Sequence, residues 1–271
     1  MGRALKLLIN RTCNMSCHFC HNEFQGTTSN NEIVSSFNID KVCLLFDRLN
    51  KEHSIENVKI SGGEPLLDAD LVIALSRAFV DRFNVSPVLL TNLTLANDML
   101  IKKLSVAGIG EIRVNMPSLE PSIYAKHVGG NRIDYETVIK NIKVLMGHEI
   151  IIVLNVVVSN LEQIGGGIRS YIKQASGLMG VHRFAFIVND RLKDKARLSN
   201  SLLTELEDLS EMPITRRRER IYQGSYLNNI VTVSSCVNWN VDNCPTQYDS
   251  DFYCIPPGII MPDKVHGRAQ A

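Results

Sequence analysis

The chain has 271 residues, of which 45% are hydrophobic and 21% charged, and its formal net charge at pH 7 is +1. This is the composition of an ordinary globular protein, and it excludes a disordered chain, a collagen-like fibre and a coiled coil. The near-neutral charge gives no sign of binding to nucleic acid or to an anionic membrane surface, and no uninterrupted apolar run is long enough to span a bilayer.

The N-terminal segment begins with a short apolar, β-rich run. Lys6 breaks this run, and Asn10 and Arg11 follow it, which is not the pattern of a secretory signal peptide. A cytoplasmic location is therefore expected.

Further along, apolar β-rich runs alternate with amphipathic helical stretches. In chain order, the pattern predicts a strand over 4–10, a helix over 39–49 with Asn38 as its N-cap, a strand over 58–61, a helix over 70–83, a strand over 87–91, a helix over 97–107, a strand over 111–116, a helix over 135–146, a strand over 150–159, a helix over 161–175 and a strand over 182–188. Three glycines at 165–167 weaken the last of these helices.

Six strands that alternate with helices predict an α/β fold with a parallel sheet and right-handed crossovers. The length allows an incomplete βα barrel or an open doubly wound sheet, and in both the chemistry gathers at the C-terminal ends of the strands. From about residue 189 the pattern changes to a tail rich in Asn, Asp, Pro and Tyr. We therefore predict a domain over 1–190 and a C-terminal appendage over 191–271.

Three of the seven cysteines lie within eight residues of one another, as Cys13, Cys17 and Cys20 with the spacing C-x3-C-x2-C. In a reducing compartment such clustering more often indicates metal binding than disulfides. One possibility is a zinc site with His18 or His21 as the fourth ligand. The other is an iron–sulfur cluster, in which three cysteines leave one iron open for a small molecule.

The cysteine spacing, placed after the first strand and with an aromatic residue before the last cysteine, resembles the radical S-adenosylmethionine (SAM) superfamily. The resemblance implies a partial (β/α)6 TIM-like barrel of parallel strands, here with a small C-terminal appendage. It also implies a [4Fe–4S] cluster on the three cysteines and SAM on the open iron. Reductive cleavage of SAM then gives a 5′-deoxyadenosyl radical that takes a hydrogen atom from the substrate. An electron donor such as flavodoxin or ferredoxin is expected.

Three further motifs agree with this resemblance in order and position. The segment Gly62-Gly63-Glu64-Pro65 follows the second strand and resembles the motif that contacts the SAM amino group. The glycines allow a close approach of the backbone, and a carboxylate or carbonyl can accept a hydrogen bond from an ammonium. Thr91-Asn92 after the third strand resembles a pair that lies near SAM, and Asn155 in the fifth strand resembles a residue near the SAM ribose.

The nearest subgroup is the GTP 3′,8-cyclase of molybdenum cofactor biosynthesis, which the chain resembles over roughly residues 5–190. Shared segments are Ala107-Gly108-Ile109, Arg113-Val114-Asn115, Ser118-Leu119-Glu120-Pro121 and Gly129-Gly130. Two departures stand out: Met116-Pro117 replaces a segment with a SAM-contacting serine, and the Gly-Gly tail of the cyclase is absent. We expect a divergent relative of the cyclase.

Three more cysteines, Cys236, Cys244 and Cys254, lie in the appendage with the spacing C-x7-C-x9-C. The segment around Cys254 resembles the last hairpin of domains that carry an auxiliary cluster. We expect a second iron–sulfur cluster on these residues, while a zinc site and unrelated thiols remain alternatives. Arg216, Arg217, Arg218 and Arg220 form a basic run that either binds an anionic substrate group or is a solvated face.

Three functions compete. The first is a radical SAM enzyme that acts on a small, nucleotide-like molecule in a cyclisation, rearrangement or oxidation. The second is a radical SAM enzyme that modifies a peptide. Only a dozen residues precede Cys13, which leaves no room for a leader-peptide domain there and disfavours this function. The third is a zinc-stabilised binding protein without catalysis, in which Gly-Gly-Glu-Pro has no role.

Overall fold

The structure is a computed structural model, and it describes residues 3–20, 37–129, 135–189, 192–211, 214–218, 221–234, 252–255 and 259–262. Its six predicted strands are confirmed as parallel neighbours in chain order: β1 (Arg3–Leu8), β2 (Ile55–Ser61), β3 (Val88–Thr91), β4 (Glu111–Asn115), β5 (Ile151–Val158) and β6 (Arg183–Val188).

The sheet continues beyond residue 190 at both of its edges. Next to β6 lie β9 (Asn229–Ser234), which is parallel to it, and then β8 (Ile221–Tyr226) and β7 (Thr215–Arg218), which are antiparallel. Next to β1 lie the parallel β10 (Phe252–Ile255) and the antiparallel β11 (Ile259–Pro262). The predicted appendage therefore adds strands to the same sheet, and the domain boundary near residue 190 stays a prediction.

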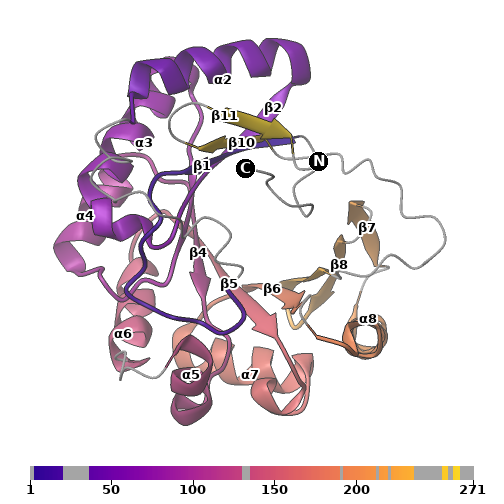
Figure 1. Cartoon of the computed structure of the whole chain (residues 1–271). Helices are drawn as coiled ribbons and strands as arrows, with labels where there is room; N and C mark the ends of the chain where they lie inside the picture. Colours follow the sequence, from indigo (N-terminus) through magenta and orange to yellow (C-terminus); the bar gives the residue numbers. More distant parts are fainter. Residues whose placement is uncertain are drawn as a thin grey trace.

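The helices lie on the outer side of the curved sheet (Figure 1). They are α2 (Ile39–His53), α3 (Ala69–Phe83), α4 (Asp98–Val106), α5 (Pro121–Val128), α6 (Tyr135–Leu145), α7 (Ile168–Met179) and α8 (Lys195–Leu209), with short 3-10 helices η1 (Pro65–Asp68) and η2 (Glu162–Ile164). Because β7 and β11 form the two edges of the sheet, the barrel is open. This confirms the predicted partial barrel.

The core lies between the sheet and this outer layer of helices. Strand alternation places Ile112 and Val114 of β4 in it, both fully buried. On the helix side, the rings of Phe46 in α2 and Phe79 in α3 meet edge to face, with centroids 5.2 Å apart. The helices thereby cover the outer face of the sheet, and the C-terminal ends of the strands carry loops.

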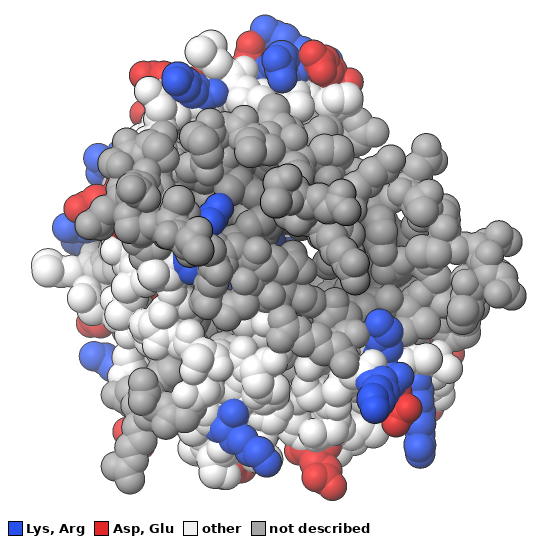
Figure 2. All heavy atoms as spheres, in the orientation of Figure 1, with Lys and Arg blue, Asp and Glu red and all other residues white. Residues whose placement is uncertain are grey.

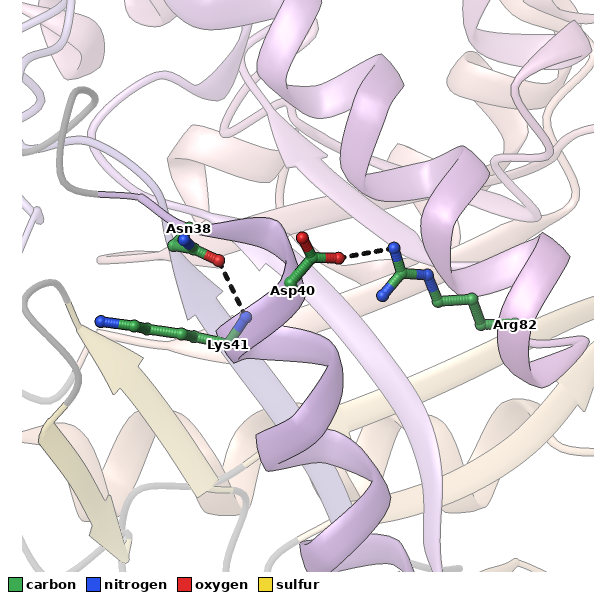
Figure 3. A network of polar contacts seen from close by, with 4 residues as sticks. All are labelled: Asn38, Asp40, Lys41 and Arg82. Atoms are coloured by element: carbon green, nitrogen blue, oxygen red, sulfur yellow. Dashed lines mark hydrogen bonds and ion pairs between the residues drawn. The ribbon is translucent and has the colours of Figure 1, made fainter.

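The predicted N-cap of α2 is confirmed. Asn38 accepts a hydrogen bond from the backbone N–H of Lys41 at 3.0 Å, which satisfies one donor of the first turn (Figure 3). In the first turn of α2, Asp40 pairs with Arg82 of α3 at 2.6 Å (Figure 3). Both side chains of this pair are exposed, so it orients the two helices more than it stabilises them.

The predicted helix over 161–175 is wrong in its position. Gly165 and Gly166 adopt positive φ angles of 66° and 96°, so the chain turns there, and α7 begins at Ile168. The Glu205 carboxylate of α8 accepts hydrogen bonds from the backbone N–H groups of Ile168 and Arg169 at 2.9 and 3.0 Å. A long-range cap therefore defines the start of this helix, and no local pattern in the sequence reveals it.

The surface of the described part carries both signs of charge. Figure 2 shows lysines and arginines next to acidic residues over α2, at the top of the view. Within the described residues, we find no helix that combines the length and the apolar character needed to cross a membrane.

Candidate cofactor site

The cysteine loop leaves the C-terminal end of β1 and lies against the end of α5. The backbone N–H groups of Ser16 and His18 donate to the carbonyl oxygens of Val128 and His127 at 3.1 and 3.3 Å. A Cβ atom on Gly129, whose φ is 99°, would lie 2.1 Å from the Ser16 hydroxyl oxygen. The loop is therefore seated on α5, a helix that the sequence analysis did not predict, although Glu120 and Pro121 are typical of a helix start.

The Gly-Gly-Glu-Pro loop after β2 packs directly on the backbone that follows β1. The N–H of Gly63 donates to the carbonyl oxygen of Asn10 at 3.1 Å, and the N–H of Glu64 donates to that of Thr12 at 2.8 Å. A Cβ atom on Gly63 would lie 1.9 Å from the Thr12 carbonyl oxygen. Gly63 thus allows contact between two loops of the protein itself.

The carboxylate of Glu64 is buried and fully engaged by the protein. Its Oε1 accepts from the Thr91 hydroxyl at 2.6 Å and from the Leu66 N–H at 2.9 Å. Its Oε2 accepts from the Asn92 N–H at 2.7 Å. Burial raises the pKa of Glu64 above its usual value, and these three hydrogen bonds oppose that rise.

These hydrogen bonds bear on the expected role of Gly62-Gly63-Glu64-Pro65, which is contact with the SAM amino group. A carboxylate that already accepts three hydrogen bonds joins the loop after β2 to Thr91-Asn92 after β3. Among the described residues, no donor is bonded to the carbonyl oxygens of Gly62 and Gly63, and both residues are partly exposed. These backbone oxygens are therefore available to accept a hydrogen bond from a ligand. Pro65, also buried, begins η1 directly behind them.

A ring of amide and hydroxyl groups joins Thr91-Asn92 to the cysteine loop. The Asn92 side-chain amide donates to Asn14 Oδ1 at 2.8 Å, and the Asn14 amide donates to the Thr94 hydroxyl oxygen at 2.8 Å. The ring closes where Asn92 Oδ1 accepts from the Thr94 N–H at 3.0 Å and from its hydroxyl at 2.7 Å. Asn14 lies between Cys13 and Cys17. The sequence analysis did not identify it as a site residue, because the cysteine spacing does not specify the residues in between.

The loop after β3 is held in an unusual backbone conformation. Leu93 is buried and has a φ of 62°, a region that side chains other than glycine seldom adopt. The buried Asn141 of α6 donates to the carbonyl oxygens of Leu93 and Ala96 at 3.1 and 2.9 Å. A polar residue on the apolar face of the predicted helix over 135–146 was the available signal for this contact.

Two asparagines on the next pair of strands are register partners, Asn115 at the end of β4 and Asn155 within β5. Asn115 of β4 donates from its amide to Cys17 Sγ at 3.9 Å. Asn155 of β5 has a buried Oδ1 atom without a partner among the described residues. An unsatisfied buried oxygen is costly, which is typical of a position where a ligand supplies the missing donor. Its predicted place near the SAM ribose stays a prediction.

Met116-Pro117 is built into the protein interior. The Met116 N–H donates to the Asn155 carbonyl oxygen at 2.9 Å, and the Met116 carbonyl oxygen accepts from the Tyr171 hydroxyl at 2.6 Å. Gln163 donates to the Pro117 carbonyl oxygen, also at 2.6 Å. This segment replaces the expected serine, and its polar groups point to the protein.

The three thiols of the loop fit a cluster. Burial, followed by the nearness of Cys13 and Cys20, raises the pKa of Cys17 to about 12, and burial also raises the pKa of Cys13. Neighbouring thiolates that are partly withdrawn from water need a strong positive partner, which a metal centre provides. Across the described ranges, no three side chains of the ligating types converge on one metal ion. A cluster would give each cysteine its own iron, so it does not require the three sulfurs to meet at one ion.

None of the described residues supplies a fourth ligand for a zinc ion on the three cysteines, the alternative that their spacing allows. The His18 ring packs on the His127 ring with centroids 4.7 Å apart, and on Phe19 at 5.7 Å. His21 lies outside the described residues.

The remaining cysteines and the basic run are only partly described. Cys236 and Cys244 lie outside the described residues. For Cys254 only the backbone is described, in β10 and opposite Leu7 of β1. The arginines of the basic run fall on or just after β7, and their side chains are likewise outside the description. Cys43, the seventh cysteine, is buried in α2.

The buried imidazole of His127 leads to a prediction for acidic pH. Its Nδ1 atom lies 2.8 Å from the Ile123 carbonyl oxygen, but burial lowers the pKa of His127. Below about pH 6.5, the ordinary histidine pKa, the unfolded chain binds a proton that the folded chain does not. We expect the free energy of unfolding to fall from there until the folded pKa is reached, and to fall less in His127→Gln. Urea unfolding across this range measures both slopes, and equal slopes would contradict the prediction.

Comparison with protein families matches more than half of the chain to a known family. The model described as the Radical SAM superfamily matches residues 7–162. Among curated proteins, a probable GTP 3′,8-cyclase of Methanococcus aeolicus is 27% identical over 220 residues, which covers 79% of this chain and 70% of that protein. Proteins of the same name from Methanococcus maripaludis and Methanocaldococcus jannaschii are each 30% identical, over 132 and 141 residues. Those two matches span only 42% and 44% of the relatives' lengths.

Two solved structures share the fold. Streptococcus suis SuiB bound to S-adenosylmethionine superposes with a TM-score of 0.56 and 17% identity, covering 77% of this chain and 45% of SuiB. Native anSMEcpe with bound AdoMet and Kp18Cys peptide gives 0.58 and 15%, covering 76% and 60%.

Proposed function

The chain belongs to the radical SAM superfamily, and we propose that it is an enzyme that cleaves SAM and abstracts a hydrogen atom from a small-molecule substrate. Members of this family use a [4Fe–4S] cluster and SAM. The observation that carries the proposal is the linkage of three loops at the C-terminal ends of β1, β2 and β3 through Glu64, Asn92 and Asn14. This linkage joins the loop that carries the thiols to the loop that carries the open backbone carbonyls, which supports the proposal.

Different residues of this chain would hold the cluster, bind SAM and position the binding groups. Cys13, Cys17 and Cys20 hold the cluster, which when bound and reduced supplies the electron that splits SAM into methionine and a 5′-deoxyadenosyl radical. The carbonyl oxygens of Gly62 and Gly63 accept from the SAM ammonium group. Glu64, Pro65, Thr91 and Asn92 position these groups, and Asn155 Oδ1 accepts from a ligand hydroxyl.

We propose a nucleotide-like substrate and a cyclisation, rearrangement or oxidation. The similarity to the M. aeolicus protein, over 79% of this chain, supports this class. Strand alternation also places Arg113 on the same face of β4 as Asn115, where Glu111 holds its Nε at 2.6 Å. A guanidinium on that face suits a phosphate group. Flavodoxin or ferredoxin would supply the electron, and a peptide substrate is the alternative.

A second cluster on Cys236, Cys244 and Cys254 is part of the proposal. Support comes from β10, because its pairing with β1 brings the backbone of Cys254 to the strand that leads into the cysteine loop. A second cluster held by Cys254 would then lie beside the strand that leads into the cysteine loop.

The test is anaerobic reconstitution of the wild type, the triple variant Cys13→Ala/Cys17→Ala/Cys20→Ala and the control Cys43→Ala. We expect the triple variant to lose about four irons per chain and all formation of 5′-deoxyadenosine with dithionite. The control, which removes a buried thiol remote from the loop, should keep both. A triple variant that still cleaves SAM would overturn the proposal.

Two further readouts of the same experiment test the second cluster and the substrate class. About four irons left in the triple variant would support the second cluster, and no remaining iron would contradict it. Nucleoside triphosphates and short peptides are then compared as substrates that increase 5′-deoxyadenosine formation by the wild type. Stimulation by peptides alone would replace the nucleotide-like substrate with the alternative.

A further inference from the structure

Two side-chain amides donate to the sulfurs of the cysteine loop. The Asn92 amide lies 3.8 Å from Cys13 Sγ, and the Asn115 amide lies 3.9 Å from Cys17 Sγ. The two asparagines follow each other across the sheet, since Thr91 and Val114, the residues just before them, are register partners on β3 and β4. Neighbouring strands thus each contribute one N–H group to a different cysteine.

The orientation of the Asn92 amide is fixed by its surroundings. Its Oδ1 atom accepts from the backbone N–H of Thr94, a group that can only donate. The nitrogen of the amide must therefore face Cys13 and Asn14. Cys13 receives a second donor from the Met15 backbone N–H at 3.4 Å.

Asn115 offers the simpler case. Within the described residues its side chain makes no hydrogen bond other than the one to Cys17. It ends β4, so its backbone is held by pairing with β5. Its amide thus has no visible part in holding a loop, in contrast to Asn92, which also belongs to the polar ring.

Donors near a cluster sulfur stabilise the form with more negative charge. Reduction adds an electron to the cluster, and hydrogen bonds to its sulfurs are among the factors that set its potential. We infer that Asn92 and Asn115 are positioning residues that raise the reduction potential of the cluster through Cys13 and Cys17. This inference rests on the function proposed above. The two asparagines would make the electron transfer that starts the reaction easier.

The test is a redox titration of reconstituted protein without SAM, followed by the electron paramagnetic resonance signal of the reduced cluster. Asn115→Leu removes the donor at nearly constant volume. We expect about a tenfold lower ratio of reduced to oxidised cluster at a fixed potential, which equals a downward shift of about 59 mV for one electron. Asn92→Leu should shift the potential in the same direction.

The matched control is Asn155→Leu, the register partner on β5, whose Oδ1 atom touches no sulfur in the described residues. Its midpoint potential should equal that of the wild type. An unchanged potential in Asn115→Leu with full iron content, or an equal shift in the control, would overturn the inference. If Asn115→Leu does not assemble a cluster, the smaller change Asn115→Ala is titrated instead. A wild type without any signal would instead count against the proposed function.

Discussion

Replacing Gly63 by alanine is expected to unfold the cofactor site and remove the iron that Cys13, Cys17 and Cys20 would hold. The added Cβ atom would lie 1.9 Å from the Thr12 carbonyl oxygen and 2.3 Å from its carbon. These are backbone atoms, so no rotation of a side chain can relieve the overlap. The two loops must separate, which breaks the hydrogen bond of 2.8 Å from the Glu64 N–H to Thr12. The cysteine loop begins at the next residue and would be displaced as well.

We expect the free energy of unfolding to fall by about 4 kcal/mol or more, the range reached only by severe steric or buried-polar defects. Urea unfolding and iron analysis measure the two effects. The matched control is Gly177→Ala in α7, where a Cβ atom meets nothing within 4 Å. That change should stabilise the protein by about 0.5–1 kcal/mol, because alanine favours a helix over glycine. Wild-type stability and iron content in Gly63→Ala would contradict the prediction.

The part of the fold that follows from local sequence pattern was predictable. The β-branched run over 150–159 and its five counterparts mark the strands, and the positions of the three motifs at strand ends follow once those strands are parallel. The places of β9 and β10 were not predictable. β9 joins β6 although β7 and β8 come between them in the chain, and β10 joins β1 from the other end of the sequence. No local pattern specifies which edge a strand will join.

The candidate site divides in the same way. Cysteine spacing and Gly-Gly-Glu-Pro are local features that carry chemistry in themselves. Asn14, Asn115 and Asn141 act through contacts made across 78, 98 and 48 residues, so their roles appear only in three dimensions. Glu64 shows why a correctly identified motif can still mislead about which of its atoms face a ligand. Its carboxylate accepts hydrogen bonds from the protein itself. Within the described part of the chain, the atoms of the loop that lack a donor are the backbone carbonyl oxygens of Gly62 and Gly63.

Glu64→Gln is expected to be strongly destabilising although it changes only one atom type. Glutamine has one acceptor oxygen, whereas the three donors on Thr91, Leu66 and Asn92 occupy both oxygens of Glu64. At least one buried N–H or O–H group would then face an NH₂ group. An unsatisfied buried donor costs about 1–3 kcal/mol, and we expect a loss in this range near neutral pH. The exposed Glu162→Gln is the control and should change stability by less than about 0.5 kcal/mol.

The difference in the free energy of unfolding between the wild type and Glu64→Gln should depend on pH. This dependence shows whether burial or hydrogen bonding has the larger effect on the pKa of Glu64. Because burial raises its pKa, the folded protein keeps a proton on Glu64 at pH values where the unfolded chain has lost it. Wild-type stability should therefore fall as the pH rises from about 4.3, the ordinary glutamate pKa, to the folded pKa. Glu64→Gln lacks this contribution, so the difference between the two proteins should narrow with rising pH. Urea unfolding of both at several pH values measures it. A difference that widens instead would mean that the three hydrogen bonds outweigh burial and hold Glu64 as an anion between the loops.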